Sequence, residues 1–599
     1  MSIPKKNKSN LTRLWVFLSK RRKLEIIQSF CLILISAFSE ILSLATFIPF
    51  LIFLSNPEKL FKIKFVFSIS RFLNIDSPDG LLIPVTLLFA LFAVLSSLMK
   101  IINFRFNSLL AARIGSDLSQ KSFSNNLYQN YTYHLNKNSS SLISTIAKHT
   151  DTTVFVIEAI LSIITNTIIS LSVITGLIIL NWKVALSTGF IISFSYILFI
   201  AKTKSYLRKN SELMAKYNAI QIKIMQESIS SIKEILVGKK QAFFNQSFKN
   251  ADYNIRILTA IGKFLGVFPR YGVEGLSILI FCGLTFSLLV LEKDLASIIP
   301  LLGGLALGVQ KLIPQIQQIY YGCSKFLMFY KDVELVLDMI EQKVEIYSTE
   351  QFPISTKQTF FNNEIVLKNI SYKYSEKSNL ILNKINIKIK KGEKVGFIGS
   401  TGCGKSTLLN IIMGLLQPTE GEILVDNKNI NKKSNVRLLY NWQKNIAIVP
   451  QTINLLDRSI LENIAFAIPT SDINFEKVYK AAAKANIENF ISSCPEGYHT
   501  NIGERGIRIS GGELQRIGIA RALYENPSIL LLDEATSAID TKTELELVNN
   551  LSTLDQDITI IMIAHRLVTL KNFDRIFELK DGKIINEFNN REFNKIKKI

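Results

Sequence analysis

The sequence predicts an α-helical transmembrane domain with six spans, followed by a C-terminal α/β P-loop domain. Three observations support this fold class. Hydrophobic residues make up 48% of the 599 residues and the mean hydropathy is +0.25, both high for a soluble protein. The apolar excess lies between about Ile26 and Tyr321. After residue 345, apolar runs alternate with Gly-rich turns and helical segments, which is typical of an α/β nucleotide-binding domain.

The apolar half contains segments long enough to cross about 30 Å of hydrocarbon, which takes about 20 helical residues. The first segment would reach about 43 Å as a straight helix, so we expect it to tilt or to protrude into the interface. It is too long for the core of a signal peptide and has no clear cleavage site, which predicts a retained span. We expect spans at 26–54, 81–103, 152–180, 184–201, 264–291 and 295–322.

Positive charge gathers on one set of linkers. Residues 1–23 carry eight Lys and Arg and no acid, and the linkers 104–150 and 202–263 are also basic. By the positive-inside rule these segments are cytoplasmic. The net charge of +22 therefore fits a membrane protein, and without a recognisable nucleic-acid module we expect no nucleic-acid partner. Six spans then return the C-terminal domain to the cytoplasm, where ATP is.

The two long cytoplasmic linkers have a helical pattern, so we expect the spans to continue into water, with tips near Tyr133–Ser139 and Gly238–Phe244. Such extensions could carry force from a soluble domain to the spans, although an ordinary polar loop is the simpler interpretation. On the outer side, residues 58–73 suit a helix or a strand equally by periodicity. We prefer a short interfacial helix there.

Several charged residues lie inside predicted spans, among them Glu40, Glu158, Arg270 and Glu274. A charge at this depth normally faces protein or water rather than lipid. Arg270 and Glu274 are spaced i,i+4, so they can pair on one helix face, and Pro269 can kink that helix. One hypothesis is that Arg270, Glu274 and Glu40 line a polar substrate path. The alternative is an ion pair that only fixes packing.

The strongest motif in the second half matches G-x-x-x-x-G-K-[ST] and follows the apolar strand Lys394–Ile398. Its glycines let backbone N–H groups wrap phosphates, and the helix that follows adds its positive N-terminal end. The Lys neutralises phosphate charge and the Ser is a ligand of Mg²⁺. We expect ATP to contact Gly399, Ser400, Thr401, Gly402, Cys403, Gly404, Lys405, Ser406 and Thr407.

Cys403 is unusual in such a loop. We interpret it as a small tolerated residue, because only its backbone N–H has to face phosphate; a redox switch is the alternative. The five cysteines show neither metal-ligand spacing nor a disulfide pattern.

A second element completes the phosphate site. Ile529–Leu532 predicts a buried strand that ends in Asp533 and Glu534. Asp533 would hold Mg²⁺, and Glu534 would polarise the attacking water as the general base.

The order of these elements resembles the ATP-binding cassette (ABC) transporter family. In that family a signature loop contacts ATP held by another subunit, a Q-loop glutamine senses Mg²⁺ and water, and a switch histidine contacts the γ-phosphate. A D-loop couples the two sites, an aromatic residue stacks on adenine, and exporters carry an X-loop. The matching residues here are Ser510, Gly511 and Gly512 (signature), Gln451, His565, Ser537–Asp540, Tyr374 and Gly503–Gly506.

The resemblance implies ATP and Mg²⁺ as cofactors, with Ser406, Gln451 and Asp533 around the metal and with Glu534, His565 and Gln451 in catalysis. It also implies a homodimer, because one chain cannot supply its own signature. Glu513 departs from the usual Gln of the signature and places a carboxylate near the opposite ATP. We expect this carboxylate either to lower the affinity for ATP or to turn away from the nucleotide, without abolishing ATP hydrolysis.

Among exporters, the sequence is most similar to bacterial lipid-linked oligosaccharide flippases, through Phe268–Gly275, Leu307–Ile316 and the outer segment ending at Ile75. This resemblance implies ATP-driven flipping or export of a lipid-linked substrate, with Arg270 meeting its head group, in a bacterial plasma membrane. A lipid or multidrug exporter shares almost every feature. A peptide exporter is less favoured, since no protease-like domain precedes the spans. An ATP-gated channel or a regulatory membrane ATPase is an alternative of another class.

The domain boundaries follow from these assignments. We expect a basic N-terminus (1–23), the transmembrane domain (24–325), a linker (326–362) and the ATP-binding cassette (363–599).

Overall fold

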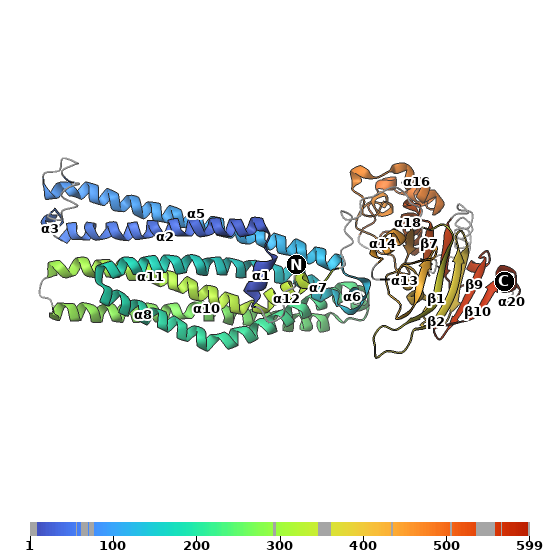
Figure 1. Cartoon of the computed structure of the whole chain (residues 1–599), viewed down its shortest axis with the longest axis horizontal. Helices are drawn as coiled ribbons and strands as arrows, with labels where there is room; N and C mark the ends of the chain where they lie inside the picture. The colour runs from blue at the N-terminus through green and yellow to red at the C-terminus, as the bar shows by residue number, and fades with distance from the viewer. Residues whose placement is uncertain are drawn as a thin grey trace. The chain divides into compact units, whose positions relative to one another are not determined.

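The computed structural model describes residues 9–596 except 56, 62–69, 71–76, 292–294, 345–360, 433–434, 504–505, 535–557 and 565. The chain divides into two compact units. The first comprises Met1–Gln129 and Asn136–Val344, and the second comprises Asn130–Leu135 and Glu345–Ile599. Figure 1 shows helices in the first unit and a mixture of strands and helices in the second.

The first unit is helical throughout its described residues. Three of its helices, α5, α8 and α10, have 46, 81 and 51 residues, far more than a bilayer needs. Its elements are α1 (Asn10–Phe17), α2 (Lys20–Ser55), α3 (Pro57–Phe61), a 3₁₀ turn (Pro78–Leu81), α5 (Leu82–Leu127), α7 (Ser139–Ile143), a π-helical turn (Ser144–His149), α8 (Thr150–Ser230), α9 (Ile232–Val237), α10 (Gln241–Leu291), α11 (Leu295–Met328) and α12 (Tyr330–Glu341). Helix α6 (Tyr131–Asn136) follows α5 in the sequence, and all but its last residue belongs to the second unit.

Four helical stretches among the described residues are long and apolar enough to cross a membrane. They are Lys20–Leu54, Pro78–Leu127, Ser139–Ile178 and Gln241–Gly283. These stretches contain most or all of the first, second, third and fifth spans expected from the sequence. The fourth and sixth expected spans lie on the second half of α8 and on α11, where many side chains fall outside the described residues.

Helix α8 must turn back on itself. Its helical assignment runs through Asn181–Lys183, where the sequence predicts a short outer linker. However, Nζ of Lys148, just before α8, lies 3.1 Å from Oε1 of Gln221 near its end. A straight helix would separate these residues by about 110 Å. In addition, Leu177 and Tyr196 belong to one buried cluster with Tyr320 of α11. The two halves of α8 therefore form an antiparallel pair.

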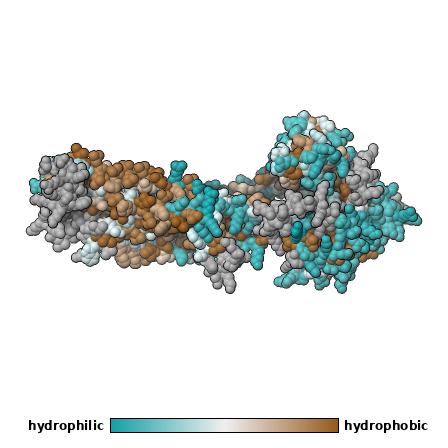
Figure 2. All heavy atoms as spheres, turned by 45° about the horizontal axis from the view of Figure 1, so that its top comes forward, coloured by the Kyte–Doolittle hydropathy of each residue, from teal (hydrophilic) through white to brown (hydrophobic). Residues whose placement is uncertain are grey.

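The surface of this unit is apolar. Phe104, Leu279 and Phe286 have 75%, 73% and 72% of their surface exposed. Figure 2 shows that hydrophobic residues gather over this part of the chain, whereas hydrophilic residues predominate on the second unit. An exposed apolar surface of this extent suits lipid rather than water.

The helices continue well beyond the expected spans. Helix α5 runs to Leu127, although the span predicted on it ends at residue 103. Helix α9 ends and α10 begins on either side of Gly238–Lys240, which lies inside one of the two expected tips. Helix α6 covers most of the other expected tip. In the predicted linker 326–362, residues 330–341 form α12, which buries Val336 and Leu337 against the helical unit. Of the expected outer helix, only α3 and Ser70 lie within the described residues.

The second unit contains two sheets. A four-stranded antiparallel sheet has the order β2-β1-β4-β5, and a six-stranded sheet has the order β10-β9-β3-β8-β7-β6. All neighbours in the second sheet are parallel except β9 and β10. The strands are β1 (Glu364–Tyr372), β2 (Leu382–Lys390), β3 (Lys394–Gly399), β4 (Glu420–Val425), β5 (Lys428–Asn429), β6 (Ile446–Val449), β7 (Ile529–Asp533), β8 (Thr559–Ile563), β9 (Arg575–Lys580) and β10 (Lys583–Asn589).

Helices cover these sheets. The parallel strands β7 and β8 are buried along most of their length, which explains their continuous apolar runs. The helices are α13 (Lys405–Ile412), α14 (Val436–Lys444), α15 (Ile460–Ile464), α16 (Phe475–Lys484), α17 (Glu488–Ser493), α18 (Gly511–Tyr524) and α20 (Asn590–Ile596), with 3₁₀ turns at Thr470–Asp472, Gly497–His499 and Leu567–Leu570.

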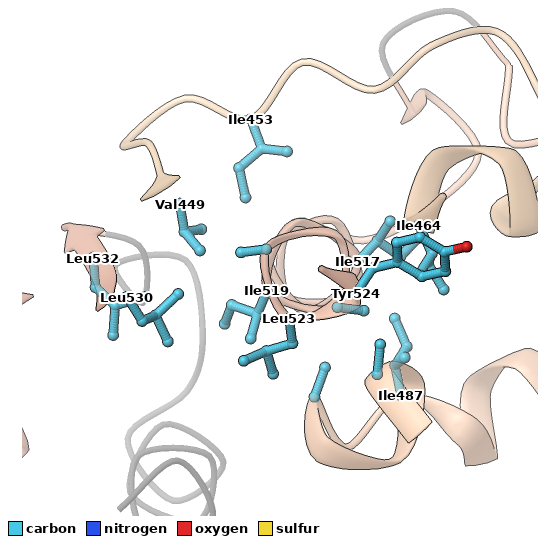
Figure 3. Packing of buried hydrophobic residues seen from close by; sticks show 14 of the residues in the cluster. Val449, Ile453, Ile464, Ile487, Ile517, Ile519, Leu523, Tyr524, Leu530 and Leu532 are labelled. Carbon is cyan, nitrogen blue, oxygen red and sulfur yellow. The ribbon is translucent and has the colours of Figure 1, made fainter. Parts of the chain in front are cut away.

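Helix α18 lies at the centre of the larger core of this unit. Its residues Ile517, Ile519 and Leu523 are almost fully buried, and they belong to the same cluster as Leu530 of β7. Figure 3 shows these side chains between the strands on one side and Ile487 on the other. Hydrophobic packing therefore fixes the segment at the start of α18 relative to the sheet.

Candidate nucleotide site and membrane cavity

The site lies where four neighbouring parallel strands end. Strands β3, β8, β7 and β6 are adjacent in that order. The Gly-rich loop follows β3, Asp533 and Glu534 end β7, and Gln451 follows β6. Carboxyl ends of parallel strands share one edge of a sheet, and ligands of open α/β sheets bind there. The topology thus gathers segments that lie far apart in the sequence.

Three glycines of the loop adopt backbone angles that other residues avoid. The φ angles are +150° at Gly399, +84° at Gly402 and +105° at Gly404. A Cβ at Gly399 would lie 2.2 Å from the carbonyl oxygen of Leu579, so a side chain is excluded there. Glycine at these positions lets the loop curve so that its N–H groups face a phosphate.

Lys405 begins α13 and is largely buried. Its Nζ donates to the carbonyl oxygens of Gly399 at 2.9 Å and Ser400 at 3.0 Å. The ammonium is therefore held inside its own loop, at the mouth of a helix N-terminus. The thiol of Cys403 is buried, with Sγ 4.0 Å from this Nζ.

Two hydrogen bonds join the loop and the strand ends. Oγ of Ser406 donates to Oδ1 of Asp533 at 3.2 Å, which brings together two oxygen ligands of the kind that Mg²⁺ prefers. Nε2 of Gln451 donates to Oε2 of Glu534 at 2.5 Å. Glu534 adopts φ +51°, a conformation that costs a residue with a Cβ about 1–2 kcal/mol. Such backbone strain is common at functional sites.

The pKa of Asp533 is raised, first because burial disfavours its charged form and also because Glu534 lies beside it. The hydrogen bond from Ser406 and the charge of Lys405 act in the opposite direction. A cation at this carboxylate would stabilise its charged form, so the environment fits a metal ligand.

A pocket of about 410 Å³ lies at this edge, lined by Lys405, Ser406, Gln451 and Glu534 among others but not by Asp533. Tyr374 stands at it and shares a hydrogen bond of 3.2 Å with Thr407. Nine of the residues that line the pocket are site residues expected from the sequence: Tyr374, Thr401, Gly402, Gly404, Lys405, Ser406, Thr407, Gln451 and Glu534. The tenth, Ile381, was missed. A lone Ile before a strand carries no chemical signal in a sequence.

The signature residues do not line this pocket. Ser510 instead caps α18, where its Oγ accepts from the backbone N–H of Glu513 at 3.4 Å. The carboxylate of Glu513 accepts from the N–H of Ser510 at 2.8 Å. These two bonds form a capping box, so Glu513 turns back to its own helix. The sequence pattern Ser-x-x-Glu contains this signal, and the sequence reasoning overlooked it.

Two expected site residues, His565 and Asp540, lie outside the described residues, as do Glu504 and Arg505 of the predicted X-loop. Their roles stay predictions.

The three residues that were predicted to line a substrate path belong to two different ion-pair groups. Arg270 and Glu274 form an i,i+4 ion pair of 2.6 Å and are half exposed. Glu40 is fully buried and forms ion pairs with Lys100 at 2.8 Å and Lys311 at 3.0 Å.

None of the three lines a cavity of about 440 Å³ in the described part of the helical unit. Helices α5, α8 and α11 form its walls. Its polar groups are mainly amides and hydroxyls, with two lysines and one glutamate: Asn103, Asn107, Asn166, Gln315, Gln318, Ser108, Ser162, Thr165, Tyr321, Lys100, Lys325 and Glu158.

Each of the two units matches a model of a known protein family. Residues 26–260 match the model of the ABC transporter transmembrane region, and residues 382–537 match the model of the ABC transporter domain. Together these matches span more than half of the chain. The solved structure of a bacterial Atm1-family ABC exporter with ATP bound superimposes with a TM-score of 0.77, covering 96% of this chain and 97% of that one at 21% identity. At that identity the likeness concerns the fold.

Curated relatives include toxin exporters. The alpha-hemolysin translocation ATP-binding protein of Proteus vulgaris is 33% identical over 390 residues, which are 64% of this chain and 53% of that protein. The leukotoxin translocation ATP-binding protein of Mannheimia glucosida is 41% identical over 245 residues, which are 41% of this chain and 34% of that protein. Multidrug resistance protein 1 of Entamoeba histolytica is 39% identical over 263 residues, which are 43% of this chain and 19% of that protein. The chain thus spans about half the length, or less, of these relatives.

Proposed function

Because both of its units match models of one family, the chain belongs to the ABC transporters, and we propose that it is a half-transporter that uses ATP hydrolysis to export or flip an amphipathic substrate. The observation that carries the proposal is the pocket where Lys405, Ser406, Gln451 and Glu534 meet, in a chain whose other unit is an apolar helical bundle. In this proposal the chain is an integral membrane protein of a bacterial plasma membrane, and its N-terminus and cassette lie in the cytoplasm.

Each group of the pocket has a chemical role in this proposal. The loop N–H groups and Lys405 bind the β- and γ-phosphates, and the Tyr374 ring stacks on adenine. Ser406 and Asp533 would hold Mg²⁺, which neutralises phosphate charge, with Gln451 nearby. Glu534 accepts a proton from the attacking water and Gln451 orients its carboxylate. His565 would contact the γ-phosphate.

A second copy of the chain completes the ATP site. The signature lies at the start of α18 and is absent from the lining of the pocket that holds Lys405. The family resemblance places Ser510, Gly511 and Gly512 on the nucleotide of the partner, with Asp540 of the D-loop between the sites. Two ATP molecules would then join two cassettes, and hydrolysis would release them. This cycle would switch the helical units between two states.

The membrane cavity supports a substrate with a polar, hydroxyl-rich head and an apolar tail, such as a lipid-linked oligosaccharide. Its amides and hydroxyls offer paired donors and acceptors of the kind that bind sugars. Its lysines suit phosphate. The exposed apolar faces of the same helices suit a tail that stays in lipid. Arg270 remains a second candidate for the head group, because its ion pair with Glu274 is half exposed.

A second candidate is export of a protein or a drug, which the names of the curated relatives favour. The two candidates differ in what should stimulate the ATPase. We expect a fluorescent lipid-linked sugar to be flipped in proteoliposomes, and an unfolded polypeptide to have no effect. Stimulation by the polypeptide alone would favour protein export instead.

The central test is Glu534→Gln, with Lys405→Ala as the matched control. Loss of a general base lowers the rate about 10²–10⁴-fold. We expect Glu534→Gln to bind ATP normally but to lose both hydrolysis and flipping, and Lys405→Ala to lose ATP binding as well. Measurement of bound nucleotide and released phosphate in nanodiscs separates these outcomes. Unchanged ATPase activity in Glu534→Gln would overturn the assignment.

A further inference from the structure

Pro269 interrupts the hydrogen bonding of α10. The helical assignment runs from Gln241 to Leu291 with this proline inside it. A proline has no backbone N–H, and in an α-helix that N–H would bond the carbonyl oxygen four residues earlier. The carbonyl oxygen of Leu265 therefore loses its usual donor within its own helix. In a membrane such an oxygen costs free energy unless a neighbouring group satisfies it.

The neighbouring helix α11 supplies the missing donor. Oη of Tyr320 donates to the carbonyl oxygen of Leu265 at 2.9 Å. About one turn earlier on α11, Nε2 of Gln317 donates to the carbonyl oxygen of Gly266 at 3.1 Å. Tyr320 and Gln317 are 1% and 6% exposed, so solvent does not compete for these bonds. The two side chains thus hold α10 where the proline has weakened it.

Tyr196, on the second half of α8, fixes this arrangement. Its Oη donates to Oε1 of Gln317 at 2.8 Å, which leaves the amide nitrogen of Gln317 turned toward α10. The rings of Tyr196 and Tyr320 also contact each other, with centres 5.4 Å apart. We call the three side chains Tyr196, Gln317 and Tyr320 the α10 clamp.

Before the proline, α10 packs closely on α11. A Cβ at Gly262 would lie 2.5 Å from Sδ of Met328, and one at Gly266 would lie 3.0 Å from Cδ2 of Tyr321. Glycine at these positions lets the two helices approach more closely than a larger residue would allow. This part of α10 is therefore tied to α11 by packing as well as by the α10 clamp.

Beyond the proline, α10 is more open. A Cβ at Gly272 or at Gly275 would meet no described atom within 4 Å. Tyr271, Leu279 and Phe286 have 70%, 73% and 72% of their surface exposed. The second part of α10 is therefore less constrained by its neighbours than the first.

The two parts of α10 meet in the turn that follows the proline. Val273 is 2% exposed and lies in one buried cluster with Tyr320, so this turn still contacts α11. Arg270 pairs with Glu274 of the same helix at 2.6 Å. An ion pair within one helix moves with that helix, so it does not tie the second part of α10 to a neighbour.

We propose that Pro269 is a hinge, at which the part of α10 beyond it bends relative to the part that the α10 clamp holds on α11. Bending at a proline breaks no intrahelical hydrogen bond at that position, because none is there. The clamp satisfies the carbonyl oxygen of Leu265, so the hinge leaves no buried oxygen unpaired. In the proposed transporter, Arg270 and Glu274 would then change direction while the first part of α10 stays packed on α11.

A comparison of two backgrounds tests the α10 clamp. Tyr320→Phe removes only the hydroxyl, and Pro269→Ala restores an N–H that can bond the carbonyl oxygen of Leu265. In the native background we expect Tyr320→Phe to lower the Tm of the full chain in detergent by about 2–4 °C, because it leaves a buried carbonyl without a donor. In the Pro269→Ala background, the same substitution should leave the Tm nearly unchanged.

Tyr196→Phe is the matched control, because it removes a hydroxyl of the same cluster that bonds a side chain and not the backbone of α10. It should lower the Tm equally in both backgrounds. Equal effects of Tyr320→Phe in the two backgrounds would overturn the role of the clamp. If Pro269→Ala fails to fold, Pro269→Leu restores the same N–H and makes the same comparison.

The distance along α10 tests the hinge itself. Spin labels are placed at Tyr253→Cys and at the native Cys282, both exposed, with the other four cysteines replaced by alanine. A straight helix separates these positions by about 44 Å. We expect pulsed electron paramagnetic resonance in nanodiscs to give shorter and broader distances with the native proline than with Pro269→Ala. Singly labelled proteins identify any distances between two copies.

The same mean and width in both proteins would overturn the hinge. Neither measurement includes nucleotide. A chain that shows the bend but hydrolyses no ATP would therefore contradict the proposed function and support the hinge.

Discussion

At the scale of single residues, Glu513 illustrates how a departure from a family pattern acquires a local structural role. Its carboxylate caps the N-terminus of α18 through the backbone of Ser510. A glutamine can make the same capping box. The carboxylate adds a favourable interaction with the positive end of the helix, so the substitution need not weaken the loop that it belongs to.

A pair of variants tests this role. We expect Glu513→Ala to lower the free energy of unfolding of the cassette by about 0.5–2 kcal/mol, the usual value of a helix cap. Glu513→Gln should retain most of that stability. Thermal unfolding of the full chain measures both, and equal destabilisation by the two substitutions would contradict the capping box.

Asp533 and Glu534 make a prediction about pH. The pKa of Asp533 is raised by burial and, less strongly, by the negative charge of Glu534. In the proposed function Asp533 holds Mg²⁺, and its protonation would remove that ligand, so Mg²⁺-dependent ATP binding should weaken as the pH falls through this pKa. Glu534→Gln removes the neighbouring charge and lowers the pKa of Asp533. In Glu534→Gln we therefore expect Mg²⁺-dependent ATP binding to be lost at a lower pH than in the wild type. Loss at the same pH in both proteins would mean that another group titrates.

Sequence reasoning succeeds for residues of the nucleotide pocket because their chemistry requires fixed spacing. The glycines and Lys405 lie in one loop, and Glu534 ends an apolar run. It fails for Glu40, whose partners Lys100 and Lys311 lie 60 and 271 residues away. Only the packing of three helices brings those charges together, and no local pattern encodes that packing.

At the scale of helices and strands, close packing between α8 and α11 sets the shape of the cavity wall. Gly322 of α11 lines the cavity, and a Cβ there would lie 2.6 Å from Cγ1 of Ile163 and 3.1 Å from the carbonyl oxygen of Ala159. Gly275 of α10 has nothing within 4 Å of such a Cβ. The two positions therefore form a matched pair for substitution.

We expect Gly322→Ala to destabilise the helical unit by about 1–3 kcal/mol, because overpacking forces side chains or backbone to shift. Gly275→Ala should be nearly neutral. Thermal unfolding in detergent measures both. A neutral Gly322→Ala would mean that α8 and α11 separate more easily than the packing indicates.

Element boundaries were less predictable than element types. Apolar runs of about 20 residues or more identify helices along α2 and α5, because a run of that length fits a membrane-spanning helix. The sequence does not reveal that helix α8 includes Asn181–Lys183, since this segment interrupts the apolar run and reads as a linker. Helix α12 lies in the predicted linker although its buried residues Val333, Val336, Leu337 and Ile340 recur at i, i+3, i+4 and i+7. This spacing predicts an amphipathic helix, and the sequence analysis overlooked it.

At the scale of the whole molecule, the proposed dimer predicts complementation between inactive chains. Lys405→Ala removes phosphate binding and Gly512→Asp blocks the signature. In a mixed dimer, one composite site carries both defects and the other carries neither. We expect co-assembly of the two inactive chains to restore about half of the wild-type sites, measured as ATPase activity in doubly tagged, purified assemblies. No recovery would indicate that each chain uses its own signature.

The arrangement of β3, β8, β7 and β6 has a consequence for the life of the protein in a cell. The residues that line its nucleotide pocket are spread from Tyr374 to Glu534, and they meet only at the edge of a finished sheet. No nascent or proteolysed fragment short of that whole stretch holds more than a part of them. An incomplete or partly degraded copy therefore cannot hydrolyse ATP, and an unfolded copy loses its ATPase activity before it is degraded.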